Sequence, residues 1–264
     1  MDLLYSNDKR GTYPPSWYAA TANTTNALPA SKPLRGETQA DVCVIGAGFT
    51  GLSAALHLAQ AGRNVVLLDA HRVGFGASGR NGGQLGSGQR MVQDGLEKLL
   101  GDDDAQNMWR LAEDAKDLVK HLVKKHNIEC HLKPGVAHAC FTKTETRHEH
   151  DYVAKLQDTY GYDQITSLDH DQMQEICPSP KYVGGSLDMG AGHLHPLNLA
   201  LGEADDLREG AVGGAARGLP LPQGDHVEGA VGEGLGEGQQ RIDPAARHRQ
   251  PQEHRRAPST GGGA

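Results

Sequence analysis

The first regular pattern in the chain is a helical run of apolar residues between two short, fully apolar runs. Residues 42–45 and 65–68 carry only aliphatic side chains and one thiol, which is typical of parallel strands that are covered on both faces. Between them, apolar residues recur at helical spacing and end at Gly62. These residues are Leu52, Ala55, Leu56, Leu58 and Ala59. The pattern predicts a strand–helix–strand unit over residues 41–70.

The turn of this unit carries a GxGxxG motif at Gly46, Gly48 and Gly51, and the second strand ends in Asp69. Gly46 permits a tight turn, Gly48 lets the backbone approach a pyrophosphate, and Gly51 lets the helix pack close to the sheet. The helix start offers N–H groups and a positive dipole end to phosphates, and Asp69 is placed to accept hydrogen bonds from ribose hydroxyls. The complete context favours a dinucleotide-binding unit over the alternative, a plain glycine turn.

A glycine-rich loop and an amphipathic helix follow. Residues 71–90 include seven glycines, and a loop of this length tends to be functional. After residues 102–104, three aspartates that suit a helix start, an apolar stripe indicates core packing. Its members are Met108, Leu111, Ala115, Leu118 and Leu122.

The middle of the chain predicts an α+β segment. The expected elements, in order, are strands at 128–132 and 136–142, helices at 145–160 and 169–176, and a strand at 182–186. Pro134-Gly135 is expected to separate the first two strands. The fold class is therefore α/β, a Rossmann-like domain with an inserted α+β subdomain.

The composition changes at Gly202. Residues 203–264 contain 13 glycines but only eight large apolar residues, a share below the roughly 20% needed to offset chain entropy. We therefore expect a disordered C-terminal tail. Residue types with AT-rich codons (Phe, Tyr, Met, Ile, Asn and Lys) number 38 before this point and one after it. This skew favours a GC-rich gene read out of frame; a genuine low-complexity tail is the alternative.

Charge and cysteine usage narrow the function class. The net charge is −7 and no basic patch is visible, so nucleic acid is not an expected partner. Four cysteines without CxxC spacing suit a reducing compartment. Residues 1–20 lack a signal-peptide core, and no apolar run approaches the roughly 18 residues that span a bilayer. We expect a soluble, cytoplasmic protein without a membrane partner.

Two histidine pairs raise the question of a metal site. They are His148 with His150 and His193 with His195, and alternating residues of a strand point to one side. Neither pair has a third ligand at suitable spacing, and zinc sites need at least three protein ligands. No metal site is expected.

Four segments carry a family resemblance. They are the arm at 15–23, the glycine turn and helix at 44–55, the loop Gly76-Ala-Ser-Gly-Arg-Asn-Gly-Gly-Gln84, and the segment at 192–202. Together they resemble FAD-dependent amine and amino-acid oxidases of the D-amino-acid oxidase/glycine oxidase fold, and within them the γ-glutamylputrescine oxidoreductase group. The resemblance covers residues 13–202.

The resemblance implies FAD as the cofactor and a set of cofactor-binding residues. These are Gly46, Gly48, Phe49, Thr50, Gly51, Asp69, Ala70, Ser78, Arg80, Asn81, Gly82 and Gly83. Backbone N–H groups of residues 80–83 would form an anion nest, and Arg80 would add a charged contact. The alternative is that Arg80 and Asn81 only brace the loop. Asp69 replaces the family's more usual glutamate and disfavours the 2′-phosphate of NADP.

The reaction implied by the resemblance is oxidation of a small-molecule amine, such as a γ-glutamylputrescine-like substrate. Hydride passes to the flavin, the imine hydrolyses, and O₂ is the expected acceptor. The residues alone leave two alternatives open: an NAD-dependent Rossmann dehydrogenase, or a fragment without activity. No catalytic residue and no oligomeric state is assigned.

The expected organisation is a partial enzyme. Its parts are an N-terminal arm at 1–36, the first part of an FAD-binding domain at 37–130, a partial substrate subdomain at 131–190, a return toward the FAD domain at 191–202, and the tail at 203–264. A Rossmann-like sheet without its later strands exposes an edge. We therefore expect weak or absent FAD binding and a tendency to aggregate.

Overall fold

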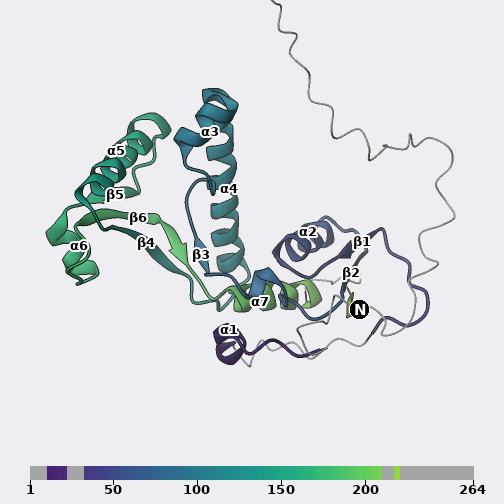
Figure 1. Ribbon diagram of the computed structural model, residues 1–264. Coiled ribbons are helices and arrows are strands. Elements are labelled where there is room, and N and C mark those ends of the chain that lie inside the picture. Colours follow the sequence, from purple (N-terminus) through teal and green to yellow (C-terminus); the bar gives the residue numbers. More distant parts are fainter. Residues whose placement is uncertain (1–10, 23–32, 210–216, 221–264) are drawn as a thin grey trace, which may run out of the picture. The chain divides into compact units, whose positions relative to one another are not determined.

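The structure, a computed structural model, describes residues 11–22, 33–209 and 217–220 (Figure 1). The helical segments are α1 (Trp17–Thr21), α2 (Phe49–Gln60), η2 (Ala77–Gly79), α3 (Gln93–Leu100), α4 (Asp102–Lys125), α5 (Lys143–Tyr160), α6 (His170–Ile176) and α7 (Pro196–Glu209). The strands are β1 (Val42–Ile45), β2 (Val65–Asp69), β3 (Gln84–Leu85), β4 (Lys133–Cys140), β5 (Ile165–Leu168), β6 (Gly184–His193) and β7 (Arg217–Pro220). The α/β fold class is confirmed.

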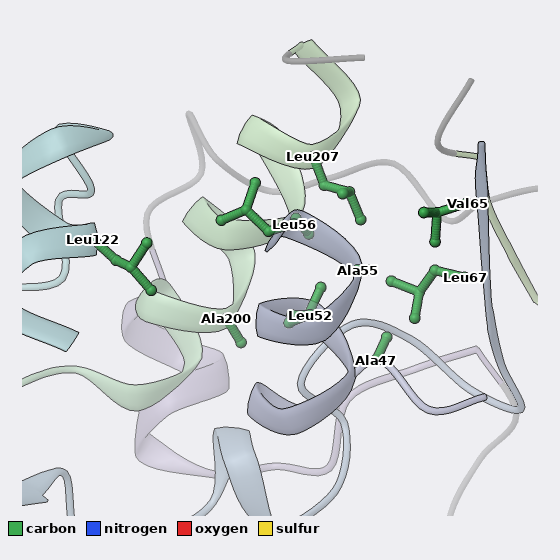
Figure 2. Close-up of a cluster of buried hydrophobic side chains, with 10 residues drawn as sticks. Ala47, Leu52, Ala55, Leu56, Val65, Leu67, Leu122, Ala200 and Leu207 are labelled. Atoms are coloured by element: carbon green, nitrogen blue, oxygen red, sulfur yellow. The ribbon is translucent and has the colours of Figure 1, made fainter. Parts of the chain in front are cut away.

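The predicted strand–helix–strand unit is present as β1, α2 and β2. β1 and β2 pair in parallel from Val42 opposite Val65 to Ile45 opposite Leu68, and β7 pairs in parallel with the other edge of β2. α2 packs against both β1 and β2 (Figure 1). Its apolar face forms a core with α7 and the inward side of β2 (Figure 2). The members shown there are Ala47, Leu52, Ala55, Leu56, Val65, Leu67, Leu122, Ala200 and Leu207.

Two glycines of the motif explain how α2 comes so close to the strand. Gly46 has φ +105°, a left-handed conformation that only glycine adopts without strain. A Cβ atom on Gly51 would lie 1.8 Å from the carbonyl oxygen of Gly46 and 3.3 Å from Cγ1 of Val44. The roles predicted for Gly46 and Gly51 are therefore confirmed.

The second sheet is antiparallel and belongs to the α+β segment. β6 pairs with β3, β4 and β5, while α5 and α6 pack against it (Figure 1). Both helices begin with a capping box, Thr142 with Glu145 in α5 and Asp169 with Gln172 in α6. A capping box satisfies orphan backbone donors at the helix start, which is why these two helices lie close to their predicted positions.

Some element predictions were wrong. Residues 128–132 do not form a strand, because their backbone bonds to the start of α7: the carbonyl of Cys130 accepts from the N–H of His195 at 2.7 Å. Pro134 and Gly135 do not separate two strands; they lie inside β4, where Gly135 has φ +93° at a bulge. The expected strand at 182–186 begins at Gly184 and continues to His193, and β5 and α3 were not predicted.

The N-terminal arm is more structured than the expected extended segment. It includes α1, whose N-cap Ser16 accepts from the N–H of Ala19 at 3.1 Å. The hydroxyl of Tyr13 donates to the carbonyl of Val73 at 2.7 Å, and Arg72 lies over the Tyr13 ring. The arm therefore contacts the segment that leads into the glycine-rich loop.

The predicted loss of order at residue 203 was placed too early. α7 continues to Glu209, and Ala204 and Leu207 are buried against α2 and β2. These two residues extend the helical spacing of the preceding apolar positions, so the core continues through them. Residues 210–216 and 221–264 lie outside the described residues, and the tail prediction stays a prediction there.

β1 presents an open edge. Among the described strands it pairs only with β2, so its other hydrogen-bonding edge is open. The side chains on one of its faces are also uncovered: Cys43 is exposed and Ile45 is 76% exposed. The expectation of an exposed sheet edge is met in this part of the chain. No helix in the described residues has the length and apolar composition that crossing a bilayer requires.

The packing at Gly51 yields a stability prediction. Gly51→Ala places a methyl group against the Gly46 carbonyl, so we expect the free energy of unfolding to fall by about 1–3 kcal/mol, as in overpacked cores. Gly76→Ala is the matched control because a Cβ there has no atom within 4 Å. Urea unfolding measures both changes. Equal stability of the two variants would contradict the close approach.

Candidate functional site

The start of α2 is open to an anion. Its N-cap, Gly48, has no side-chain capping bond, and its first turn carries no acidic residue. The N–H of Phe49 donates to Oγ of Ser78 at 3.0 Å, and a Cβ on Gly48 would lie 2.8 Å from the same oxygen. The structure thus brings the glycine turn and the second glycine loop together. Apart from the bond to Ser78, the helix start has no side-chain cap, and such a start fits a phosphate group.

Asp69 joins the end of β2 to the glycine turn. Its Oδ2 accepts from the N–H of Ala47 and its Oδ1 from the N–H of His71, both at 2.7 Å. These two bonds fix the carboxylate at the carboxyl end of the strand. Each carboxylate oxygen retains further acceptor capacity, so the arrangement fits the predicted contact with a ribose.

Asn81 shapes the second glycine loop from within. Its side-chain amide donates to the carbonyls of Ala77 and Ser78 at 3.1 and 3.0 Å, and its Oδ1 accepts from the N–H of Gly83 at 2.8 Å. These bonds are the ones that a bracing residue makes. The N–H of Gly83 is therefore occupied within the loop, not directed at a ligand.

Arg80 also contacts its own loop. Its Nε donates to the carbonyl of Gly76 at 3.4 Å, its guanidinium lies 5.0 Å from the centre of the Phe75 ring, and its backbone N–H donates to Ala77 at 3.2 Å. Two of the four N–H groups in the expected anion nest are thus used internally, those of Arg80 and Gly83. The nest stays a prediction, and it would depend on the N–H groups of residues 81 and 82.

The remaining predicted cofactor-binding residues lie around the glycine turn and the second glycine loop. Thr50 is exposed on the first turn of α2, Ala70 directly follows Asp69, and Gly82 is exposed with open space where a side chain would be. The structure therefore gathers the predicted residues at the start of α2, the end of β2 and the second glycine loop.

A cavity of about 490 Å³ adjoins this site. Phe49 and residues 81–83, all predicted cofactor contacts, form one side of it. The other side comes from α4 and α7, which the sequence analysis did not connect with the site. The residues missed there include Leu118, Val119, Leu122, Leu199 and Glu203. The apolar stripe on α4 was assigned to core packing, and part of it lines this cavity.

Glu203 is the charged residue of this cavity. It is 3% exposed, and its Oε2 has no hydrogen-bond partner in the described residues. Burial, and then the nearby carboxylate of Asp206, raise the pKa of Glu203 to about 7. Sequence reasoning placed this residue in the tail and therefore missed it. The helical spacing of Leu199, Ala200, Ala204 and Leu207 was the signal that could have kept it in α7.

A buried polar network contacts the second glycine-rich segment near its end, at Ser87. Nζ of Lys116 donates to Oγ of Ser87 at 2.8 Å, to Oε2 of Glu113 at 2.6 Å and to the hydroxyl of Tyr162 at 3.2 Å. Tyr162 donates in turn to Oδ1 of Asp188 at 2.6 Å. Burial and this bond to Asp188 raise the pKa of the Tyr162 hydroxyl. The network links the loop to α4 and to β6.

The histidine pairs do not form ligand pairs. His193 ends β6 and is exposed, whereas His195 is buried and caps α7: its Nδ1 accepts from the N–H of Asn198 at 3.1 Å. Nε2 of His195 therefore carries the proton and donates to Thr21 on α1 at 3.1 Å. Burial and the nearby His131 lower the pKa of His195.

The other pair lies on the helix that the sequence predicts at residues 145–160, so the shared side of a strand does not apply to it. His148 and His150 lie on α5, where residues two apart point to different faces. Within the described residues, no group of three or more potential ligands could hold a metal ion.

Comparison with known proteins bears on this geometry. A family model described as DAO, FAD dependent oxidoreductase, matches residues 41–215. The chain is 39% identical over 193 residues to gamma-glutamylputrescine oxidoreductase of Escherichia coli K12, covering 73% of this chain and 44% of that protein. It is 38% identical over 200 residues to the probable oxidoreductase OrdL of Rhizobium meliloti, covering 76% of this chain and 45% of that protein.

A solved structure shows the same fold. An L-amino acid deaminase from Proteus vulgaris superposes with a TM-score of 0.58 at 16% identity, covering 80% of this chain and 50% of that one. The chain spans less than half the length of the two curated relatives.

The raised pKa of Glu203 gives a pH prediction. Because the folded-state pKa is about 7 and the unfolded value about 4.5, the folded protein binds a proton more tightly across that interval. Stability therefore falls as the pH rises from 4.5 to 7, by roughly 3 kcal/mol at about 1.4 kcal/mol per pKa unit. Glu203→Gln cannot ionise, so its stability relative to wild type should rise by that amount between pH 4.5 and pH 8.

Thermal and urea unfolding across this pH range measure the difference. Asp205→Asn, a similar change on the same helix outside the cavity, is the control for the substitution itself. If the difference in the free energy of unfolding between Glu203→Gln and wild type did not vary with pH, the carboxylate of Glu203 would ionise in the folded protein as it does in water.

The polar network gives a second prediction. Tyr162→Phe removes the hydroxyl that donates to Asp188 and accepts from Lys116. Hydrogen bonds to charged groups contribute about 1.5–3 kcal/mol each, so the free energy of unfolding should fall by about 1–3 kcal/mol. Tyr182→Phe is the control, because the Tyr182 hydroxyl makes no hydrogen bond within the described residues. Urea unfolding distinguishes them, and an equally small effect of both changes would exclude a structural role for the network.

Proposed function

Because the chain belongs to the FAD-dependent oxidoreductase family, of the amine and amino-acid oxidase type, we propose that it takes part in oxidising the carbon–nitrogen bond of a small amine. The observation that carries the proposal is the contact between its two glycine segments, the N–H of Phe49 with Ser78. That contact places the uncapped start of α2 beside the loop at residues 76–84. NAD-dependent dehydrogenases need only the first of these segments.

FAD is the cofactor, and the residues fit it. The start of α2 would hold the pyrophosphate, Asp69 would accept from the adenosine ribose, and the second glycine loop would lie along the rest of the cofactor. When bound, the flavin supplies the acceptor for a hydride. This chain's own residues bind and orient the cofactor, and the apolar walls of the adjoining cavity exclude water.

The finer proposal concerns the substrate and the acceptor. The Escherichia coli relative is named for gamma-glutamylputrescine, which supports a γ-glutamylputrescine-like amine as the substrate of the family-length enzyme. We propose O₂ as the electron acceptor and a place in polyamine breakdown in the cytoplasm. The substrate partner is then a small molecule.

This chain alone should bind the cofactor weakly. It spans less than half of its curated relatives, and the described part of its sheet leaves β1 with an open edge. The relatives' remaining length would add contacts that this chain does not supply. We therefore expect weak, saturable FAD binding, a tendency to aggregate, and little or no turnover; a fragment without activity is the second candidate function.

Flavin titration tests the proposal. Quenching of FAD fluorescence should saturate as protein is added, whereas NAD should show no binding. Asp69→Ala should weaken FAD binding at least tenfold, since charged hydrogen bonds of this kind contribute about 1.5–3 kcal/mol each. Asp114→Ala, an exposed carboxylate on α4, is the matched control and should leave FAD binding unchanged. NAD binding without FAD binding would overturn the assignment.

Turnover separates the two candidate functions. Hydrogen peroxide formed from γ-glutamylputrescine by the FAD-loaded chain would show that it is active as it stands. FAD binding without peroxide would favour the fragment.

A further inference from the structure

The cavity beside the glycine loop has an unusual distribution of charge. Aromatic and aliphatic side chains supply most of its wall, among them Phe49, Leu118, Leu194 and Leu199. Glu203 is the single ionisable group among its described lining residues. At about 490 Å³ the cavity is within the range of small-molecule sites. An apolar cavity with one carboxylate is complementary to an apolar molecule with one positive charge.

The carboxylate itself lacks a partner. Glu203 is 3% exposed, and its Oε2 has no hydrogen bond within the described residues. The groups close to it add no positive charge that could balance it: Asp206 is acidic and Cys130 is a buried thiol. His126, which could carry a positive charge, is paired with Asp206 at 3.1 Å. A buried carboxylate oxygen without a donor costs several kcal/mol, and a bound cation would remove that cost.

We propose that this cavity binds an alkylammonium group, with the ammonium on Oε2 of Glu203 and the alkyl chain along the apolar wall. The ligand class is a primary amine in its charged form. Its identity as the substrate rests on the proposed function, whereas the binding itself follows from the cavity and the carboxylate. The raised pKa of Glu203 supports the proposal, because a group that ionises reluctantly when alone ionises readily beside a cation.

Calorimetric titration at pH 8 with n-butylammonium chloride tests the proposal, and neutral n-butanol serves as the matched ligand. Wild type should bind butylammonium saturably and at least tenfold more tightly than butanol. Glu203→Gln should lose that preference, so that both ligands bind it weakly and about equally. Asp205→Asn should behave as wild type, because this carboxylate does not line the cavity.

Urea unfolding at pH 8 shows whether Glu203→Gln is folded, so a folded variant without the preference reports on the carboxylate itself. Absence of saturable butylammonium binding by wild type would overturn the proposal. So would equal binding of butanol, or unchanged butylammonium binding by Glu203→Gln.

The two proposals fail separately. FAD titration without binding would reject the proposed function of this chain while butylammonium binding stands. FAD binding without any preference for butylammonium would reject only the amine site.

Discussion

The close approach of α2 to the carbonyl of Gly46 is the constraint on which the rest of the described structure depends. A side chain at Gly51 would overlap that oxygen, so the helix reaches its place only because the residue is glycine. From that place, α2 buries Leu52, Ala55 and Leu56 against β2 and α7. The same approach leaves the uncapped helix start beside Ser78 and near the carboxylate of Asp69. Core packing and cofactor geometry therefore follow from one contact.

Helix α7 connects the two sheets. At its start, His195 caps the helix and bonds to Cys130, and Leu194 bonds to Gly83 of the glycine loop. Further along, Ile128 packs closely on Gly202. A Cβ atom on Gly202 would lie 2.3 Å from Cγ2 of Ile128. The next residue, Glu203, lines the cavity. A helix that supports the loop thus also places an unpartnered carboxylate beside it.

Local signals in the sequence predicted the first βαβ unit and the helices α5 and α6. Gly46 and Gly51 act through φ and through a missing side chain, and the caps at Thr142 and Asp169 act within one turn. Residues 128–132 have the alternation of a strand but bond to α7 instead, which depends on contacts about 65 residues away along the chain. Glu203 was missed for a different reason, because composition averaged over the tail concealed the last seven residues of α7, from Glu203 to Glu209.

The central claim is that the two glycine segments together hold FAD. A crystal structure of the protein grown with saturating FAD tests it most directly. The pyrophosphate should lie within hydrogen-bond distance of the N–H groups at the start of α2, with the adenosine ribose on Asp69. FAD bound elsewhere on the chain, or a well-ordered glycine turn with no cofactor at saturating FAD, would contradict the account.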